Sequence, residues 1–352
     1  MKIAGAVGVV NFQEARVRLG RIQVDGPDGP VPRLAVADPA RGLVVDLVRA
    51  ERLRLQRQGA SPEAALRLAA ALFPGSMAAA IGAGPLLVEA AARAVEADGD
   101  GDGDAALPLD EVRLLAPLDP PRMRDCMAFE GHIRNAFGRL GSPVPTQIYE
   151  LPIYYKGNPD TLIGHDAEVP WPAYSQYMDY ELELGFVIGP HLGPGRSLTP
   201  EEARPHLFGV TIFNDFSARD AQAREMGGSL GPAKGKDFAT AIGPWIATAD
   251  ELDLESLDMV ARVNGEEWSR GSIGQIMWSV EELIAYASSS EPLLPGELIA
   301  SGTVPLGCGL ELGRQLQPGD VVELEVSGVG LLRNRLGEPE PLRWSPSPRV
   351  PS

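Results

Sequence analysis

The chain has 352 residues, of which 44% are hydrophobic and 22% are charged. These values are ordinary for a globular protein with a sizeable core and about two domains. Asp and Glu number 48 against 31 Lys and Arg, which gives a formal net charge of -17. A chain this acidic does not suit the phosphate backbone of nucleic acids, so we expect no nucleic-acid partner. The charge suits divalent cations, although most of these carboxylates serve solubility.

The cysteines, the histidines and the N-terminal sequence further limit the compartment and the kind of metal site that the protein can have. The two cysteines, Cys126 and Cys308, indicate a reducing compartment and no disulfide framework. With only four histidines in the chain, a metal would be held by oxygen ligands instead of a histidine cluster. The run Lys2–Asn11 predicts a first strand and not a signal peptide. No apolar stretch of about 20 residues predicts a membrane span, so we expect a cytoplasmic protein with no membrane partner.

Residues 1–118 predict a small N-terminal domain that mixes strands and helices. The strand patterns cover Arg18–Val24 and Leu43–Leu47, and the helical patterns cover Pro62–Leu72 and Ala78–Val95. The acidic repeat DGDGDGD at Asp98–Asp104 resembles a calcium-binding loop. It lacks the later bidentate glutamate of such loops, so it predicts a flexible acidic linker near residues 98–106.

Residues 119–340 predict a β-rich domain with helices at its edges, followed by an irregular, proline-rich tail at 341–352. Short β-type runs alternate with Gly and Pro turns. These runs are Glu181–Ile188, Phe208–Phe213, Trp245–Thr248, Val260–Val263, Leu298–Ser301, Val321–Val326 and Gly328–Arg335. The intervening helical patterns are Pro200–Arg204 and Gln275–Ala287.

Acidic residues at the ends of predicted strands are candidates for a functional site. Glu181 and Glu183 are two positions apart on one strand and share a face, where two like charges repel unless a cation or solvent intervenes. From spacing alone, a half-exposed strand with a polar face is the better interpretation. Asp215 follows the run Thr211–Asn214 where a strand gives way to a turn, although a turn or helix-capping aspartate also fits. Asp220 fits only such a structural role.

Two further segments carry candidate polar groups. Asp125 ends a strand-like run, and His132 follows about two helical turns later. A single histidine is more often structural than catalytic, although histidines are few in this chain. Lys236 lies among small residues that would let it approach an anion, and a solvated loop lysine is the alternative.

Together and in this order, these segments resemble the fumarylacetoacetate hydrolase family from about Arg122 to Arg335. The resemblance is strongest to bacterial acylpyruvate hydrolases and to 2-hydroxyhepta-2,4-diene-1,7-dioate isomerases and related hydratases of aromatic degradation. The blocks that carry it are AFEGH, YYKGNPDT, DYELELGFVIG, TIFNDFSARDAQ, GPAKGKDFATAIGPW, SGTVPLGCGLELG and GDVVELEVSGVGLLRNR. The resemblance implies an α+β, β-rich fold, with a mixed β-roll catalytic domain behind the smaller N-terminal domain, and a homodimer.

The resemblance also implies the site. Its metal ligands are Asp125, Glu181, Glu183 and Asp215, with Lys236 and Thr240 beside them. Such an all-oxygen site takes Mg²⁺ or Ca²⁺, with Mn²⁺ also possible. The residues that match substrate-facing positions are Arg219, Gln222, Tyr155 and Thr303. His132 matches a general base that Glu311 orients, and Lys236 joins them as a catalytic residue.

We expect a hydrolase that cleaves a C–C bond in a small keto acid, a 1,3-diketo acid of the fumarylacetoacetate or acylpyruvate type. Isomerisation or decarboxylation of a keto-dicarboxylate in aromatic catabolism is the alternative, since both use an enolate. A non-catalytic structural homologue is a third reading, and the retained ligand positions argue against it. Met127 stands where many relatives have tyrosine, which removes one polar substrate contact. Asn135 replaces a glutamate of smaller relatives and favours the arrangement that uses Glu311.

Overall fold

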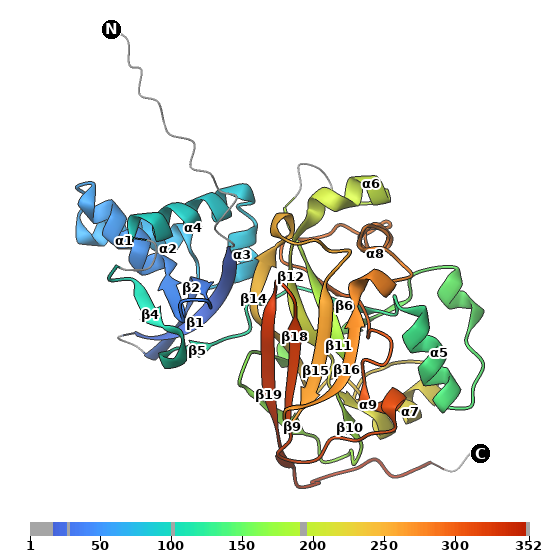
Figure 1. The fold of residues 1–352 in the computed structure, drawn as a ribbon. Coiled ribbons are helices and arrows are strands. Elements are labelled where there is room, and N and C mark those ends of the chain that lie inside the picture. Colours follow the sequence, from blue (N-terminus) through green and yellow to red (C-terminus); the bar gives the residue numbers. More distant parts are fainter. Residues whose placement is uncertain (1–16, 27–28, 100–102, 191–195, 350–352) are drawn as a thin grey trace.

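The structure is a computed structural model that describes residues 17–26, 29–99, 103–190 and 196–349. The predicted strand Lys2–Asn11 lies outside the described residues. Within them, no helix combines the length and the apolar character that a membrane span requires. The fold is α+β and β-rich, a β-roll preceded by a smaller mixed part, as the resemblance implied (Figure 1).

The N-terminal part places helices on one side of a curled set of strands (Figure 1). Its strands are β1 (Arg18–Gly26), β2 (Gly29–Asp38), β3 (Leu43–Asp46) and β4 (Ala106–Pro108), and its helices are α1 (Leu47–Arg57), α2 (Pro62–Leu72), α3 (Met77–Ile81) and α4 (Pro85–Ala97). The bounds predicted for α2 are confirmed, because Ser61 caps it and Pro62 begins it. The helix predicted over Ala78–Val95 is two helices, separated at Gly84, whose φ is +63°. The acidic linker joins α4 to β4, and buried Asp98 accepts a hydrogen bond from Ala105 N.

The C-terminal part is built on two large sheets, the first of which also contains the N-terminal strands. The first is twelve-stranded, with the order β4-β3-β2-β1-β14-β12-β11-β17-β6-β7 and with β5 and β8 at its side, and the second has the order β16-β15-β18-β19-β9. Of the first sheet, β5 (Arg113–Leu114) still belongs to the N-terminal part and pairs with β1. The strands of the first sheet in the C-terminal part are β6 (Met123–Cys126), β7 (Tyr154–Gly157), β8 (Leu162–Ile163), β11 (Leu182–Ile188), β12 (Leu207–Asn214), β14 (Thr240–Thr248) and β17 (Leu298–Ala300). Those of the second are β9 (Glu168–Trp171), β15 (Asp258–Val263), β16 (Glu266–Ser272), β18 (Val321–Val326) and β19 (Gly330–Pro339).

Short elements complete this part. They are the strand pair β10 (Met178–Asp179) and β13 (Ser217–Ala218), and the helices α5 (Glu130–Arg139), α6 (Pro200–Ala203), α7 (Arg219–Gly227), α8 (Val280–Ala287) and α9 (Gly309–Leu312). The helix predicted from Gln275 begins later, at Val280, because Ser279 and Glu282 form a capping box there.

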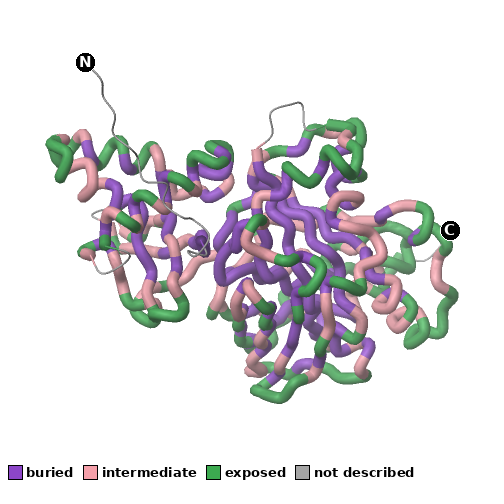
Figure 2. Tube along the Cα trace, turned by 45° about the horizontal axis from the view of Figure 1, so that its top comes forward, coloured by how far each residue is buried: buried purple, intermediate pink, exposed green. Residues whose placement is uncertain are grey.

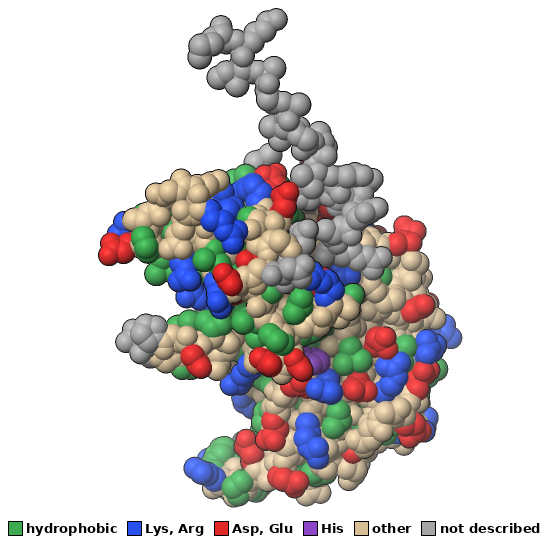
Figure 3. All heavy atoms as spheres, turned by 60° about the vertical axis from the view of Figure 1, so that its left-hand side comes forward, with side chains coloured by type: hydrophobic (Ala, Val, Ile, Leu, Met, Phe, Trp, Pro, Cys, Tyr) green, Lys and Arg blue, Asp and Glu red, His purple; other side chains and the backbone are tan. Residues whose placement is uncertain are grey.

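The two parts share one sheet. β1 pairs antiparallel with β14, with Arg18 opposite Ala247 and Leu19 opposite Ile246. The division predicted near residue 118 therefore separates chain segments whose strands hydrogen-bond to each other. Acidic and basic side chains are interspersed over the face in Figure 3.

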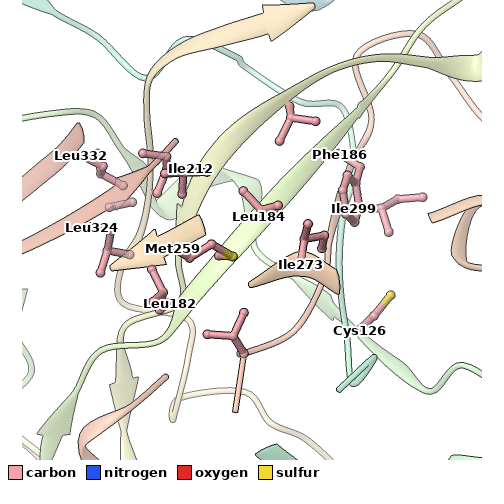
Figure 4. Packing of buried hydrophobic residues seen from close by; sticks show 14 of the residues in the cluster. Cys126, Leu182, Leu184, Phe186, Ile212, Met259, Ile273, Ile299, Leu324 and Leu332 are labelled. Carbon is pink, nitrogen blue, oxygen red and sulfur yellow. The ribbon is translucent and has the colours of Figure 1, made fainter. Parts of the chain in front are cut away.

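The core lies between the two large sheets. Leu182, Leu184 and Phe186 alternate along β11 and are fully buried, and they point towards side chains of the second sheet such as Met259 and Leu324 (Figure 4). Each such side chain contributes roughly 1.5–3 kcal/mol of burial free energy. The central strands are the most continuously buried stretch of the chain (Figure 2). This rigid frame holds β11, whose other face carries Glu183.

Candidate active site

Two strands of the first sheet, β6 and β11, bring carboxylates together. Asp125 lies in β6, Glu183 lies in β11, and Glu181 immediately precedes β11. All three side chains are at least 95% buried, and one oxygen from each lies within 4.8 Å of the others. The alternation that predicted Glu181 and Glu183 on one face is therefore confirmed. A half-exposed polar face, which spacing alone favoured, is not what forms.

Two buried cations neutralise only part of this charge. Lys236 Nζ lies 2.5 Å from Glu181 Oε2 and 2.6 Å from Asp215 Oδ2. Arg219 Nη1 lies 2.8 Å from Glu181 Oε1. The buried carboxylates of this region are Asp125, Asp179, Glu181, Glu183 and Asp215, and the buried cations are Lys236 and Arg219. Five negative charges against two positive ones leave a formal charge of -3.

The uncompensated charge falls on Asp125 and Glu183. Burial, followed by repulsion from Glu183 and Asp215, raises the pKa of Asp125 well above its usual value. Burial and repulsion from Glu181 raise the pKa of Glu183 in the same way. Burial acts to raise the pKa of Glu181 too, but Lys236 and Arg219 outweigh it and lower that pKa to about 2. Glu181 is thus paired, while Asp125 and Glu183 lack a positive partner.

A divalent cation fits this donor set. Among the described residues, Asp125 Oδ1 is buried and has no hydrogen-bond partner. Oxygen ligands with excess negative charge suit hard cations such as Mg²⁺, Mn²⁺ and Ca²⁺. Asp125, Glu181 and Glu183 have the positions to hold one. Asp215 lies next to them, but Tyr155 Oη donates to its Oδ2 over 2.6 Å and Thr240 Oγ1 to its Oδ1 over 3.3 Å.

Neighbouring loops fix Glu183. Thr303 Oγ1 donates to Glu183 Oε1 over 3.0 Å, and Gly302 N donates to Oε2 over 3.1 Å. Gly302 has φ +81°, and a Cβ there would lie 2.2 Å from Cys126 O. Only glycine fits between β6 and β11 at this point. Tyr155 and Thr303 therefore lie in the predicted site, bonded to its carboxylates, and their contact with substrate stays a prediction.

A histidine–carboxylate pair lies beside the cluster. His132 is the third residue of α5, so the loop 127–129 and the first helical turn separate it from Asp125, not two helical turns. His132 Nδ1 lies 2.9 Å from Glu311 Oε2, and Asn135 Nδ2 donates to Glu311 Oε1 over 2.9 Å. Burial acts to raise the Glu311 pKa, but the bonds from His132 and Asn135 lower it overall. His132 is also among the groups that lower the Glu181 pKa, after Lys236 and Arg219.

The pair arises because α5 and α9 lie side by side (Figure 1). Asn135 follows His132 by one helical turn, and both side chains reach the same carboxylate on α9. The Glu311 side chain is 0% exposed. With Nδ1–H held by an ionised carboxylate, Nε2 is left as the basic nitrogen.

Asp179 is a residue of this site that the sequence did not reveal. It is fully buried, and its carboxylate accepts from Arg219 Nε over 2.8 Å, Gly309 N over 2.7 Å and Leu310 N over 3.0 Å. It thereby ties the arginine that contacts Glu181 to the helix that carries Glu311. It opens the block DYELELGFVIG, but two of its partners are backbone amides about 130 residues away, so its residue type alone did not mark it as part of the site.

Glu225 on α7 was also not predicted. Its carboxylate accepts from three consecutive amides, Ala233 N, Lys234 N and Gly235 N, over 2.7–3.0 Å. These amides immediately precede Lys236 and fix the loop that presents it. Arg219 Nη1 donates to Gln222 Oε1 over 3.1 Å, so Gln222 is brought to the site as predicted. Asp220 accepts from Ser175 and Gln176, the structural role expected of it.

A large hollow lies elsewhere in the described structure. It has a volume of about 1640 Å³ and is lined by β1, β5, β8 and the end of β18, including Arg113, His165 and Trp245. None of the carboxylates described above lines it. The converging charged groups, not the size of a cavity, therefore mark the candidate site.

Known proteins resemble the chain over most of its length. The family profile described as fumarylacetoacetate (FAA) hydrolase C-terminal matches residues 123–337. The human mitochondrial oxaloacetate tautomerase FAHD2A is 31% identical over 271 residues, which are 75% of this chain and 80% of that protein. Oxaloacetate tautomerase YisK of Bacillus subtilis is 32% identical over 65% of this chain and 74% of its own. The structure of fumarylacetoacetate hydrolase from psychrophilic Exiguobacterium antarcticum has a TM-score of 0.67 and 27% identity, covering 91% and 99% of the two chains.

Proposed function

Because this chain belongs to the fumarylacetoacetate hydrolase family, we propose that it is a metal-dependent enzyme that moves a proton at the carbon next to a 2-oxo group. The observation that carries this proposal is the juxtaposition of two sets of groups. A carboxylate cluster with excess negative charge lies beside a histidine whose Nδ1 is held by a buried glutamate. An enolate forms readily where a cation and a base act on one substrate.

We further propose keto–enol tautomerisation of a 2-oxodicarboxylate of the oxaloacetate type as the reaction. Two relatives above 30% identity carry this activity in their names. The match covers 80% of one and 74% of the other. The sequence alone favoured hydrolysis and kept isomerisation as the alternative. Tautomerisation needs only one proton removed and one returned, which a single histidine can do.

Each residue then has a role. When bound by Asp125, Glu181 and Glu183, a divalent cation supplies Lewis-acid stabilisation of negative charge on a chelating 2-oxo acid. His132 Nε2 takes the proton from C3 and returns it to oxygen, or the reverse. Glu311 holds Nδ1–H and stabilises the imidazolium that forms between the two steps. Lys236 and Arg219 supply fixed positive charge beside the substrate oxygens.

Hydrolytic C–C cleavage of an acylpyruvate is the second candidate, and one observation favours it. The His132 side chain is 15% exposed, so water can reach its basic nitrogen. His132 would then take a proton from water, and the hydroxide would add to the distal carbonyl. The C–C bond breaks, its electron pair stays on the pyruvate part as an enolate, and a proton completes the product.

The test is an absorbance and mass assay on purified protein. The enol form of oxaloacetate and an acylpyruvate are each incubated with Mg²⁺ or Mn²⁺ and, separately, with excess chelator. We expect rapid metal-dependent loss of oxaloacetate enol absorbance without change of mass. A product pair heavier by one water would establish hydrolysis instead, and loss of carbon dioxide would establish decarboxylation.

His132→Ala tests the base, and His165→Ala is its matched control. His165 is a partly buried histidine that lines the distant hollow. Activity should vanish in the first variant and persist in the second. Equal activity in both would overturn the assigned base, and a wild-type protein without turnover or metal binding would indicate a non-catalytic homologue.

A further inference from the structure

Three different donor atoms converge beside His132, the proposed base. A ring nitrogen of His132, Cys308 Sγ and an oxygen of Glu311 all lie within 4.8 Å of one another. The Cys308 thiol donates to Glu311 Oε2 over 3.4 Å, and His132 Nδ1 lies 2.9 Å from the same oxygen. Cys308 is fully buried, and the Glu311 side chain is 0% exposed. The mechanism proposed above makes no use of the thiol.

This donor set differs in kind from the carboxylate cluster. One nitrogen, one sulfur and one oxygen favour Zn²⁺ and similar transition-metal ions, whereas all-oxygen sites favour Mg²⁺, Mn²⁺ and Ca²⁺. Tetrahedral bonds of about 2.0–2.3 Å place neighbouring ligand atoms roughly 3.3–3.7 Å apart. His132 Nδ1 and Cys308 Sγ lie 2.9 and 3.4 Å from Glu311 Oε2, and these two separations are close to that spacing.

The surroundings hold these donors in place. Glu311 Oε1 accepts from Asn135 Nδ2 and from Leu306 N, each over 2.9 Å, which leaves Oε2 directed at the histidine and the thiol. The backbone of Cys308 pairs with that of Glu181 in an antiparallel bridge. Such outer contacts orient ligands and are typical of real metal sites. Three protein ligands would leave a fourth position for water.

We propose that Cys308, His132 and Glu311 form a second metal site, specific for Zn²⁺-type ions, that switches the enzyme off. The site is separate from the carboxylates that hold the catalytic cation. Binding of the ion is independent of the proposed function, and only its inhibitory effect rests on that function.

Inhibition follows from where the protons lie on the His132 imidazole when the ion is bound. Coordination by the thiolate releases the Cys308 proton to solvent. Coordination by Nδ1 requires the lone pair of that nitrogen, so the ring proton moves from Nδ1 to Nε2. The ion takes the place of the hydrogen bond to Glu311. Nε2 then carries a proton and cannot accept one from substrate or water.

Co²⁺ is the probe for binding, because cobalt–thiolate bonds give a charge-transfer band in the near ultraviolet. The intact protein is first saturated with Mg²⁺ and then titrated with Co²⁺. We expect the band in the wild type and in Cys126→Ala, and its loss in Cys308→Ala. Cys126 is the matched control, since it is the other buried free cysteine. Absence of the band in the wild type, or its persistence in Cys308→Ala, would overturn the site.

Zn²⁺ inhibition is measured in the same three proteins under excess Mg²⁺, each relative to its own zinc-free rate. We expect inhibition in the wild type that added Mg²⁺ does not relieve, weakened about tenfold or more in Cys308→Ala. Inhibition that Mg²⁺ relieves equally in all three proteins would place Zn²⁺ on the carboxylates and overturn the switch. If no substrate is turned over, the proposed function fails while the cobalt band still decides the site.

Discussion

Asp179 and Arg219 form a fully buried ion pair, in which Arg219 Nε donates to Asp179 Oδ2 over 2.8 Å. The other end of the guanidinium contacts Glu181, and the other oxygen of the carboxylate contacts the first amide of α9. One pair of side chains thus joins the carboxylate cluster to the helix that carries Glu311. The distance between base and cation site depends on it.

Asp179→Asn should therefore weaken both the fold and the activity. Breaking this buried pair on one side leaves Arg219 with Glu181 as its charged partner in the site, at a cost of about 3–5 kcal/mol of unfolding free energy. Asp166→Asn is the control, because its pair with Arg333 is about half exposed and should cost less than about 1 kcal/mol. Urea denaturation gives both values. Equal losses of unfolding free energy in the two variants would show that the buried Asp179 pair stabilises the fold no more than the exposed Asp166 pair.

Removing one charge from the cluster should affect the metal-free and metal-bound proteins in opposite directions. Asp125→Asn relieves repulsion on a buried carboxylate with no positive partner, so the chelator-treated variant should be more stable than wild type by roughly 1–3 kcal/mol. The same variant should lose most of the rise in melting temperature that Mn²⁺ gives the wild type. Differential scanning fluorimetry with Mn²⁺ and with chelator measures both.

Glu338→Gln, an exposed carboxylate at the end of β19, is the control for that experiment. It should leave both melting temperatures unchanged. If Asp125→Asn also destabilised the chelator-treated protein, the repulsion inferred between Asp125 and Glu183 would be refuted.

Gly302 gives a prediction about close packing between strands. A Cβ at Gly302 would lie 2.2 Å from Cys126 O, whereas one at Gly265 meets nothing within 4 Å, and both glycines have φ near +80°. Gly265→Ala should cost about 1 kcal/mol of unfolding free energy for the left-handed backbone alone. Gly302→Ala should cost at least twice that and displace Glu183 from Asp125. A comparable cost at both positions would mean that β6 can move freely.

Some parts of this site could be predicted from the sequence and others could not, for physical reasons. The shared face of Glu181 and Glu183 follows from strand alternation alone, and the bounds of α2 follow from Ser61 and Pro62. Glu311 was placed beside His132 only through the family resemblance, because nothing local links α5 to α9. Asp179 and Glu225 were missed, since most of their hydrogen-bond partners are backbone amides that no residue type marks. The roles assigned to Tyr155, Gln222 and Thr303 towards substrate stay predictions.

The elements missed in the N-terminal part have equally specific causes. Pro30 and Pro32 interrupt the alternation of β2, although its pairing with β1 continues to the hairpin end. The helix α1 follows β3 without a break, so its first residue, Leu47, was predicted as the end of the strand Leu43–Leu47 and the helix itself was not predicted. Asp46 marks the change, because its side chain accepts from Arg49 N and caps the helix.

Asp46 also gives a pH-dependent prediction. Burial raises its pKa above the usual 3.8, against the lowering effect of the bond from Arg49 N and of Arg33. Since the folded state binds this proton more tightly than the unfolded state, stability falls as pH rises from 3.8 through the folded pKa. Above that window the ionised side chain destabilises the fold. Asn keeps the capping oxygen without the charge, so Asp46→Asn should be more stable than wild type at neutral pH.

The advantage of Asp46→Asn should shrink as the pH falls towards 3.8, where the wild-type carboxyl is protonated. Asp46→Ala loses the cap and should cost about 1 kcal/mol at neutral pH. Ser61→Ala removes the uncharged cap of α2 and should cost a similar amount that does not change with pH. Urea denaturation of the wild type and these three variants from about pH 4 to about pH 8 separates the effect of the Asp46 charge on stability from the effect of capping. A pH-independent difference between Asp46→Asn and wild type would show that burial of Asp46 does not shift its ionisation.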